Sequence, residues 1–233
     1  MESNRLGLSS NGLKLLAMLC MTVDHLGLIL LPQYIFLRMI GRLAFPIYAW
    51  MIAEGCRYTR NMGRYLGLML GMGVLYQVVC TGIVGLWTMN ILLTFSMSIG
   101  LCWLLQKWEQ TGKWFYLPLL LAALGSVFFL TDIVPLLFRG KEFSIDYGLL
   151  GVLLPVALYL SRGKVQKLLV GGVILCCLAY WSGWDVQWMS LLALPLLALY
   201  NGTRGKWKLK WLFYIYYPAH LCVLWVIWFL CRK

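Results

Sequence analysis

The chain has 233 residues, of which 62% are apolar and only 12% are charged, so its polar side chains are too few to cover a water-soluble globule. Its net charge of +12 does not indicate a nucleic-acid-binding module, because the cations lie in short breaks between apolar runs. In such breaks, lysine and arginine are better explained by contact with anionic lipid headgroups. The composition therefore predicts a protein that crosses a lipid bilayer several times.

The apolar runs predict about nine membrane-spanning helices, separated by charged or Gly- and Pro-rich breaks. In chain order they are residues 13–31, 35–55, 65–83, 90–105, 115–134, 147–160, 166–182, 188–200 and 211–231. Three of them, at 90–105, 147–160 and 188–200, are shorter than the ~20 residues of a full crossing. No polar stretch is long enough for a soluble domain, so we expect residues 1–233 to form a single all-α transmembrane domain, a polytopic helical bundle.

The placement of lysine and arginine predicts the orientation of the chain, because short cytoplasmic loops are enriched in these residues. Fourteen of the twenty cations lie at the N-terminal end and in alternate breaks: Arg5, Lys14, Arg57, Arg60, Arg64, Lys107, Lys113, Arg162, Lys164, Lys167, Arg204, Lys206, Lys208 and Lys210. The opposite breaks hold only Arg139 and Lys141. We therefore expect a multi-pass protein of the cell membrane, with its N-terminus in the cytoplasm and its C-terminus outside it.

The first predicted span contains an unusual polar stripe. Ionisable residues at membrane depth are costly, so they are candidates for function unless they only tie helices together. Lys14 and His25 lie eleven residues apart, which places them on one helix face, ~16 Å apart along the axis. The neighbouring Asp24 is expected to meet Arg38 or Arg42 on the second span, since adjacent side chains point ~100° apart. Alternatively, Asp24 bends towards the ring of His25 and fixes its tautomer.

The second and the last spans each contain a proline near ionisable side chains. Because Pro46 cannot donate to the carbonyl of Arg42, the second span is expected to kink and to expose an acceptor near that cation. Tyr217 and His220 are three residues apart, so their side chains are neighbours on the surface of the last span. Counted from the inner surface, His220 is ~12–14 Å deep and His25 ~18 Å, so the two imidazoles are expected to converge near mid-membrane.

Polar residues also gather at the predicted outer ends of the spans. They are Asn90, Asp132, Asp146 and Asp185. Each alone is typical of a helix cap or a solvated end, but together they are candidates for an outward mouth. No C-x-x-C pair and no cluster of histidine with cysteine is present in the sequence, so no metal site is predicted.

The assembled segments resemble the TraX family of bacterial membrane proteins, whose founding member is associated with N-terminal acetylation of conjugative pilin. The segments that carry the resemblance are LKLLAMLCMTVDHLG, RMIGRLAFPIYAWMIAEGCRYTRNMGRYL, MNILLTF, DYGLLGVLLP and KWLFYIYYPAHL. They occur in the family's order, from Leu13 to beyond His220. TraX proteins in turn resemble transmembrane acyltransferases, in which a basic residue precedes a first-helix histidine at the spacing of Lys14 and His25.

The resemblance implies an acetyltransferase of the bacterial inner membrane. Acetyl-coenzyme A (acetyl-CoA) would be the cytoplasmic donor, and an amine or hydroxyl at the outer side, in a protein N-terminus or a surface glycan, the acceptor. His25 would be the general base or a transient acyl carrier. Further catalytic candidates are Asp24, His220, Arg42 and Tyr217. Candidates for binding the coenzyme are Lys14, Arg57, Arg60 and Arg64, and for binding the acceptor Arg38, Asn90 and Asp146.

Two other functions stay open from the residues alone. A proton-coupled transporter also needs buried Asp, His and Arg side chains and broken helices, although matching interrupted segments in two halves are not present in the sequence. A non-catalytic membrane protein would use the same polar side chains only to hold its helices together.

Overall fold

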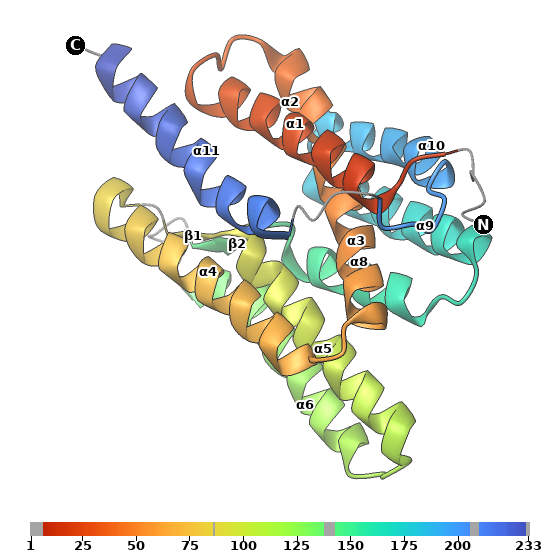
Figure 1. Ribbon diagram of the computed structural model, residues 1–233. Coiled ribbons are helices and arrows are strands. Elements are labelled where there is room, and N and C mark those ends of the chain that lie inside the picture. Colours follow the sequence, from red (N-terminus) through yellow and green to blue (C-terminus); the bar gives the residue numbers. More distant parts are fainter. Residues whose placement is uncertain (1–6, 86, 138–142, 206–209, 232–233) are drawn as a thin grey trace. The chain divides into compact units, whose positions relative to one another are not determined.

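A computed structural model of the protein describes residues 7–85, 87–137, 143–205 and 210–231 (Figure 1). The helices are α1 (Ser10–Ile29), α2 (Ile35–Gly41), α3 (Ala44–Tyr58), α4 (Met62–Val84), α5 (Ile91–Thr111), α6 (Tyr116–Phe128), α7 (Val134–Leu137), α8 (Gly148–Leu160), α9 (Lys164–Ser182), α10 (Ala193–Ala198) and α11 (Lys210–Cys231). A π-helical turn, η1 (Phe129–Ile133), joins α6 to α7, and a 3₁₀ helix, η2 (Asp185–Leu192), precedes α10. Two short strands, β1 (Thr88–Met89) and β2 (Ser144–Ile145), pair in parallel. The all-α prediction is confirmed.

Six helical stretches in the described part of the chain are long and apolar enough to cross a membrane. They are Ser10–Ile29, Ile35–Tyr58, Met62–Gly82, Ile91–Thr111, Tyr116–Leu137 and Lys164–Ser182. Three shorter apolar helical stretches cover Gly148–Leu160, Asp185–Ala198 and Ile215–Cys231. Each of the nine predicted segments falls on one of these stretches. The length of the three shorter ones leaves the predicted count of nine crossings unconfirmed, while a multi-pass membrane protein is supported.

The chain forms two compact units. The first unit contains Met1–Met51 and Gly163–Lys233, and the second contains Ile52–Arg162. That the whole chain forms one transmembrane domain stays a prediction.

In the first unit, α1 packs against both α2 and α11, while η2 packs against α2, α9 and α10. Glycines permit the close approach of α1 and α2. A Cβ atom built on Gly27 would lie 2.8 Å from Leu37 Cβ, and one built on Gly41 would overlap the side chain of Asp24. The backbone of α2 therefore lies directly against the acidic side chain of α1.

A kink is predicted at Pro46, but the structure has a complete break in the helix just before it. Helix α2 ends at Gly41, and α3 begins at Ala44. Pro46 lies in the first turn of α3, where the missing backbone N–H removes no helical hydrogen bond. The break separates a short helix that presents Arg38 from a longer one that continues into the second unit.

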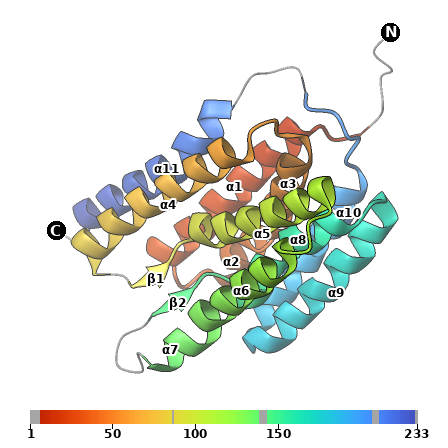
Figure 2. The ribbon, with the colours of Figure 1, turned by 90° about the horizontal axis from the view of Figure 1, so that it is seen from below.

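In the second unit, α5 packs between α4, α6 and α8, and the β1–β2 pair lies where α5 and α8 begin (Figure 2). The backbone N–H of Asp146 donates to the carbonyl of Met89, and Thr94 Oγ1 donates to the carbonyl of Asp146. These bonds hold the starts of the two helices together.

Candidate active site

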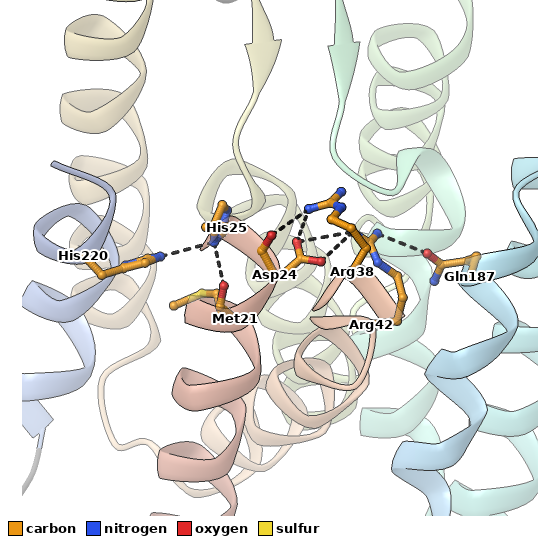
Figure 3. Close-up of polar contacts among 7 residues, drawn as sticks. All are labelled: Met21, Asp24, His25, Arg38, Arg42, Gln187 and His220. Atoms are coloured by element: carbon orange, nitrogen blue, oxygen red, sulfur yellow. Dashed lines mark hydrogen bonds and ion pairs between the residues drawn. The ribbon is translucent and has the colours of Figure 1, made fainter. Parts of the chain in front are cut away.

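Two histidines meet in the first unit, one from α1 and one from α11. Nε2 of His220 lies 3.2 Å from Nδ1 of His25, and the two rings meet edge to face with centroids 5.1 Å apart (Figure 3). His220 is buried, and His25 is partly buried. The expected convergence of the two imidazoles is therefore present.

Backbone carbonyls fix the tautomers of both rings. Nδ1 of His25 lies 2.8 Å from the carbonyl oxygen of Met21, and Nδ1 of His220 lies 2.8 Å from that of Tyr216. A carbonyl oxygen only accepts hydrogen bonds, so both Nδ1 atoms carry a proton when the rings are neutral. Nε2 of His220 then accepts from Nδ1–H of His25. Nε2 of His25 is left as an unprotonated nitrogen, and the described residues offer it no hydrogen bond.

Two tyrosines of α11 surround the ring of His220. Tyr216 stacks on it with centroids 5.2 Å apart, and Tyr217 meets it edge to face at 5.8 Å. The hydroxyl of Tyr216 is 2.5 Å from Oγ1 of Thr22 on α1, and Thr22 in turn donates to the carbonyl of Met18. The predicted neighbour Tyr217 thus contacts His220, and Tyr216 adds a second aromatic surface and a hydroxyl link between α1 and α11.

Asp24 pairs with both arginines of the second segment. Nη1 of Arg38 lies 2.6 Å from Asp24 Oδ2, and Nη2 of Arg42 lies 3.0 Å from Oδ1. Arg38 also donates to the backbone carbonyl of Asp24, at 3.3 Å. Of the two partners considered for Asp24, the off-helix arginines are the ones the structure gives it, while His25 bonds Met21 and His220 instead.

Both arginines also contact residues at the start of η2. The ring of Trp184 lies 4.8 Å from Cζ of Arg42 and 5.5 Å from that of Arg38. Nη1 of Arg42 donates to Oε1 of Gln187 at 3.3 Å. Figure 3 shows His220, His25, Asp24, the two arginines and Gln187 in a row across four helical segments, α11, α1, α2 and η2.

Four basic residues predicted to bind the coenzyme are divided between the two units. Lys14 belongs to the first unit, where its Nζ lies 5.2 Å from the centroid of the Phe213 ring. Arg57 belongs to the second unit and donates to the carbonyls of Tyr159 and Ser161 at the C-terminal end of α8. Arg60 and Arg64, in the same unit, are exposed. Arg57 thus has a structural partner, and a shared phosphate site for the four cations stays a prediction.

The two acceptor-binding candidates of the second unit lie beside the β1–β2 pair. Asn90 caps α5 by accepting from the backbone N–H of Leu92, and its Nδ2 donates to the carbonyl of Gly73 and to Oε1 of Gln77. Asp146 is joined to Met89 and Thr94 through its backbone. The side chain of Asn90 therefore stabilises the fold as a helix cap, and its role in acceptor binding stays a prediction.

Four residues of this site were missing from the sequence prediction: Thr22, Tyr216, Trp184 and Gln187. Thr22 lies one turn before His25 on α1, and Tyr216 one turn before His220 on α11. The helical spacing that selected Tyr217 at i, i+3 from His220 would also have found Tyr216 at i, i+4. For Trp184 and Gln187 the only signal was their closeness in sequence to Asp185. Among the described residues, no group of three or more His, Cys, Asp or Glu side chains is placed to hold a metal ion.

Comparison with protein families matches residues 9–228 to a family described as TraX protein. A probable fimbrial assembly protein, FimC of serogroup H1 from Dichelobacter nodosus, is 26% identical over 252 aligned positions, which cover 95% of this chain and 96% of that protein. An uncharacterized protein of Rickettsia prowazekii (strain Madrid E) is 26% identical over 166 positions, covering 71% of this chain and 58% of that protein. No solved structure matches.

Proposed function

This chain belongs to the TraX family, and we propose that it transfers an acetyl group from acetyl-CoA to an amine or hydroxyl of an acceptor reached from the outer side of the membrane. The observation that carries this proposal is the contact between His25 and His220, at 3.2 Å, within a protein whose helices are apolar enough to span a bilayer. A polar contact that only ties helices together needs one hydrogen bond. Here Nε2 of His25, a basic nitrogen, has no hydrogen bond to any residue that the structure describes.

His25 is the general base in this mechanism. Its Nε2 takes the proton of the acceptor amine or hydroxyl as that group attacks the thioester carbon. The new bond to the acetyl carbon forms, the carbon–sulfur bond breaks, and the proton passes from His25 to the departing thiolate, which leaves as coenzyme A. Because Nδ1–H of His25 donates to Nε2 of His220 and to the carbonyl of Met21, these two acceptors stabilise the positive charge that the ring gains.

Asp24 and the two arginines have a supporting part. The Asp24 carboxylate fixes Arg38 and Arg42 beside the next turn of α1, and this positive pair favours negative charge that develops on the thioester oxygen. We assign Arg38 to acceptor binding and Arg42 to charge stabilisation, with Tyr217 packing the ring of His220 into position.

The donor enters from the cytoplasmic side in this proposal. The candidates for binding its phosphates are Lys14 in the first unit and, separately, Arg57, Arg60 and Arg64 in the second. Exposed arginines bind phosphate with two parallel hydrogen bonds, and a lysine binds it as a point charge. Because Arg57 already donates to two backbone carbonyls, the exposed Arg60 and Arg64 supply most of the phosphate binding in the second unit.

The acceptor that we propose first is the N-terminal amine of a fimbrial or pilin subunit. The similar protein of Dichelobacter nodosus is described as a probable fimbrial assembly protein, and the alignment covers nearly all of both chains. A surface glycan hydroxyl is the second acceptor to be tried.

The test is a transfer assay with the full-length protein in nanodiscs. Radiolabelled acetyl-CoA is supplied with a pilin N-terminal peptide or a glycan, and labelled acceptor and released coenzyme A are measured. We expect transfer by the wild type and a loss of roughly 10²- to 10⁴-fold in His25→Ala, the usual contribution of a general base.

Leu28→Ala is the matched control, because Leu28 lies on the same helix and its side chain is 55% exposed. It should retain full activity. The proposal would be overturned if the wild type did not bind acetyl-CoA and neither hydrolysed nor transferred its acetyl group. Equal rates for wild type and His25→Ala would also overturn it.

A further inference from the structure

The 3₁₀ helix η2 carries a line of polar side chains into the interior of the first unit. Gln187 and Ser190 are three residues apart, and side chains at this spacing eclipse each other on a 3₁₀ helix, ~6 Å apart along its axis. Burial follows the same spacing, since Gln187 is 3% exposed and both Ser190 and Ala193 are fully buried. The polar line thus points inward.

Both side chains hold buried polar atoms without a hydrogen-bond partner among the residues that the structure describes. These atoms are Nε2 of Gln187 and Oγ of Ser190. Arg42 determines the orientation of the Gln187 amide, because a guanidinium group only donates and must therefore face the amide oxygen. The NH₂ group consequently points away from Arg42. A buried donor left unsatisfied is costly, so two of them on one face indicate a ligand that accepts hydrogen bonds.

The charge near these atoms indicates the class of ligand. Arg38 and Arg42 both pair with the carboxylate of Asp24, which places two positive groups around this one negative group. The Trp184 ring covers both guanidinium groups, at 4.8 Å from Arg42 and 5.5 Å from Arg38, and limits their access to water. An anionic oxygen ligand fits this cluster better than a neutral one, because buried charge is least costly when it is balanced.

We propose that Gln187 and Ser190, beside Arg42 and under Trp184, form a binding site for a carboxylate-bearing ligand. The amide NH₂ of Gln187 and the hydroxyl of Ser190 donate to the carboxylate oxygens. The Arg42 guanidinium, held between Asp24 and Gln187, supplies the positive field. This site lies at the opposite end of the row in Figure 3 from His220, and it needs no acetyl transfer for its existence.

The test is thermal unfolding of the full-length protein in nanodiscs with three probes at matched ionic strength: acetate, acetamide and chloride. Acetate should raise the melting temperature by about 3 °C relative to chloride, the size expected for a weak ligand near ten times its Kd. Acetamide, which has the same shape without the charge, should have no effect. An equal rise with acetamide or with chloride would overturn the proposal.

Two variants locate the site. Ser190→Ala removes a buried hydroxyl that has no described partner, so it should unfold at the same or a higher temperature than the wild type and yet lose the acetate-induced rise. Gln187→Glu places a carboxylate of the chain itself against Arg42, so it should raise the melting temperature without acetate and abolish the response to it. A full acetate response in either variant would refute the site.

The matched control is Ser98→Ala in the second unit. Ser98 is also fully buried, but its hydroxyl lies within hydrogen-bond distance of the carbonyls of Val152 and Thr94. This variant should melt at a lower temperature and keep the acetate-induced rise. The melting temperature does not depend on acetyl transfer. A negative transfer assay with a positive acetate response would therefore refute the proposed reaction and still support the carboxylate site.

Discussion

At the scale of single residues, the candidate active site contains a pair of imidazoles whose neutral forms both carry the proton on Nδ1. Each ring uses its own helix backbone, one turn earlier, to hold the proton on Nδ1. That leaves His220 as the acceptor and His25 as the ring with a basic nitrogen. The order of the two roles follows from hydrogen-bond chemistry and not from the order of the residues in the chain.

The first prediction concerns His220. In His220→Leu the acceptor for His25 Nδ1–H is lost while the bond to Met21 remains, so the turnover rate should fall roughly tenfold, the rate equivalent of about one hydrogen bond. The KM for acetyl-CoA should stay unchanged. Adding His220→Leu to His25→Ala should cause no further loss, because residues that act as one unit are not additive. A multiplicative loss in the double variant would contradict the shared role.

The second prediction concerns Asp24. Asp24→Asn removes the carboxylate that Arg38 and Arg42 share, so the free energy of unfolding, measured by denaturant titration in mixed micelles, should fall by about 3 kcal/mol. Asp185→Asn is the control, since Asp185 is exposed and forms no ion pair within the described residues. Its effect should stay within about 0.5 kcal/mol. Equal stability of the two variants would show that the arginines do not depend on Asp24.

At the scale of secondary-structure elements, the site depends on how closely α1 and α2 approach. The side chain of Asp24 occupies the place where a Cβ of residue 41 would lie, so the ion pair and the close contact of α1 with α2 both depend on Gly41. A larger residue at this position has to separate the two helices or displace the carboxylate from the arginines.

The third prediction follows from this contact. Gly41→Ala should destabilise the protein by about 1–3 kcal/mol, as overpacking of a closely packed site does. Gly71→Ala on α4 is the matched control, because a Cβ there would meet no atom within 4 Å. Alanine is favoured over glycine within a helix, so this control should gain about 0.5–1 kcal/mol. If Gly41→Ala were also stabilising, α1 and α2 would not be packed as described.

The sequence predicted the helical segments well because apolar length is a direct property of the chain. It also predicted the meeting of His25 with His220 and the candidate partners of Asp24, since depth and helix face follow from residue spacing. It did not predict Trp184 and Gln187. Their segment is a 3₁₀ helix, and rotation about a helix axis relative to its neighbours is set by packing that a single sequence does not display.

At the scale of the whole molecule, family membership and the apolar helices agree on a multi-pass membrane protein. The three short apolar stretches decide how many times the chain crosses, and an odd number of crossings places the two termini on opposite sides. The distribution of lysine and arginine favours opposite sides.

The fourth prediction tests this orientation. Alkaline phosphatase fused after Lys233 should be active, because this enzyme works only outside the cytoplasm, and a fluorescent protein fused at the same point should remain dark. Fused before Met1, the fluorescent protein should be bright, as the cation-rich side is cytoplasmic. An inactive phosphatase fusion after Lys233, together with a bright fluorescent-protein fusion at the same point, would mean an even number of crossings.

The shared carboxylate of Asp24 also has a consequence for how the protein enters the membrane. A lone aspartate or arginine at the centre of a helix opposes insertion by about 2.5–3.5 kcal/mol, so α1 and the arginine-bearing segment are each penalised when they enter alone. Only Leu30 to Tyr34 separate α1 from α2, which allows both to leave the translocon together. We expect the two segments to be released into lipid as a preformed hairpin, already neutralised in part by the bonds of Asp24 to Arg38 and Arg42.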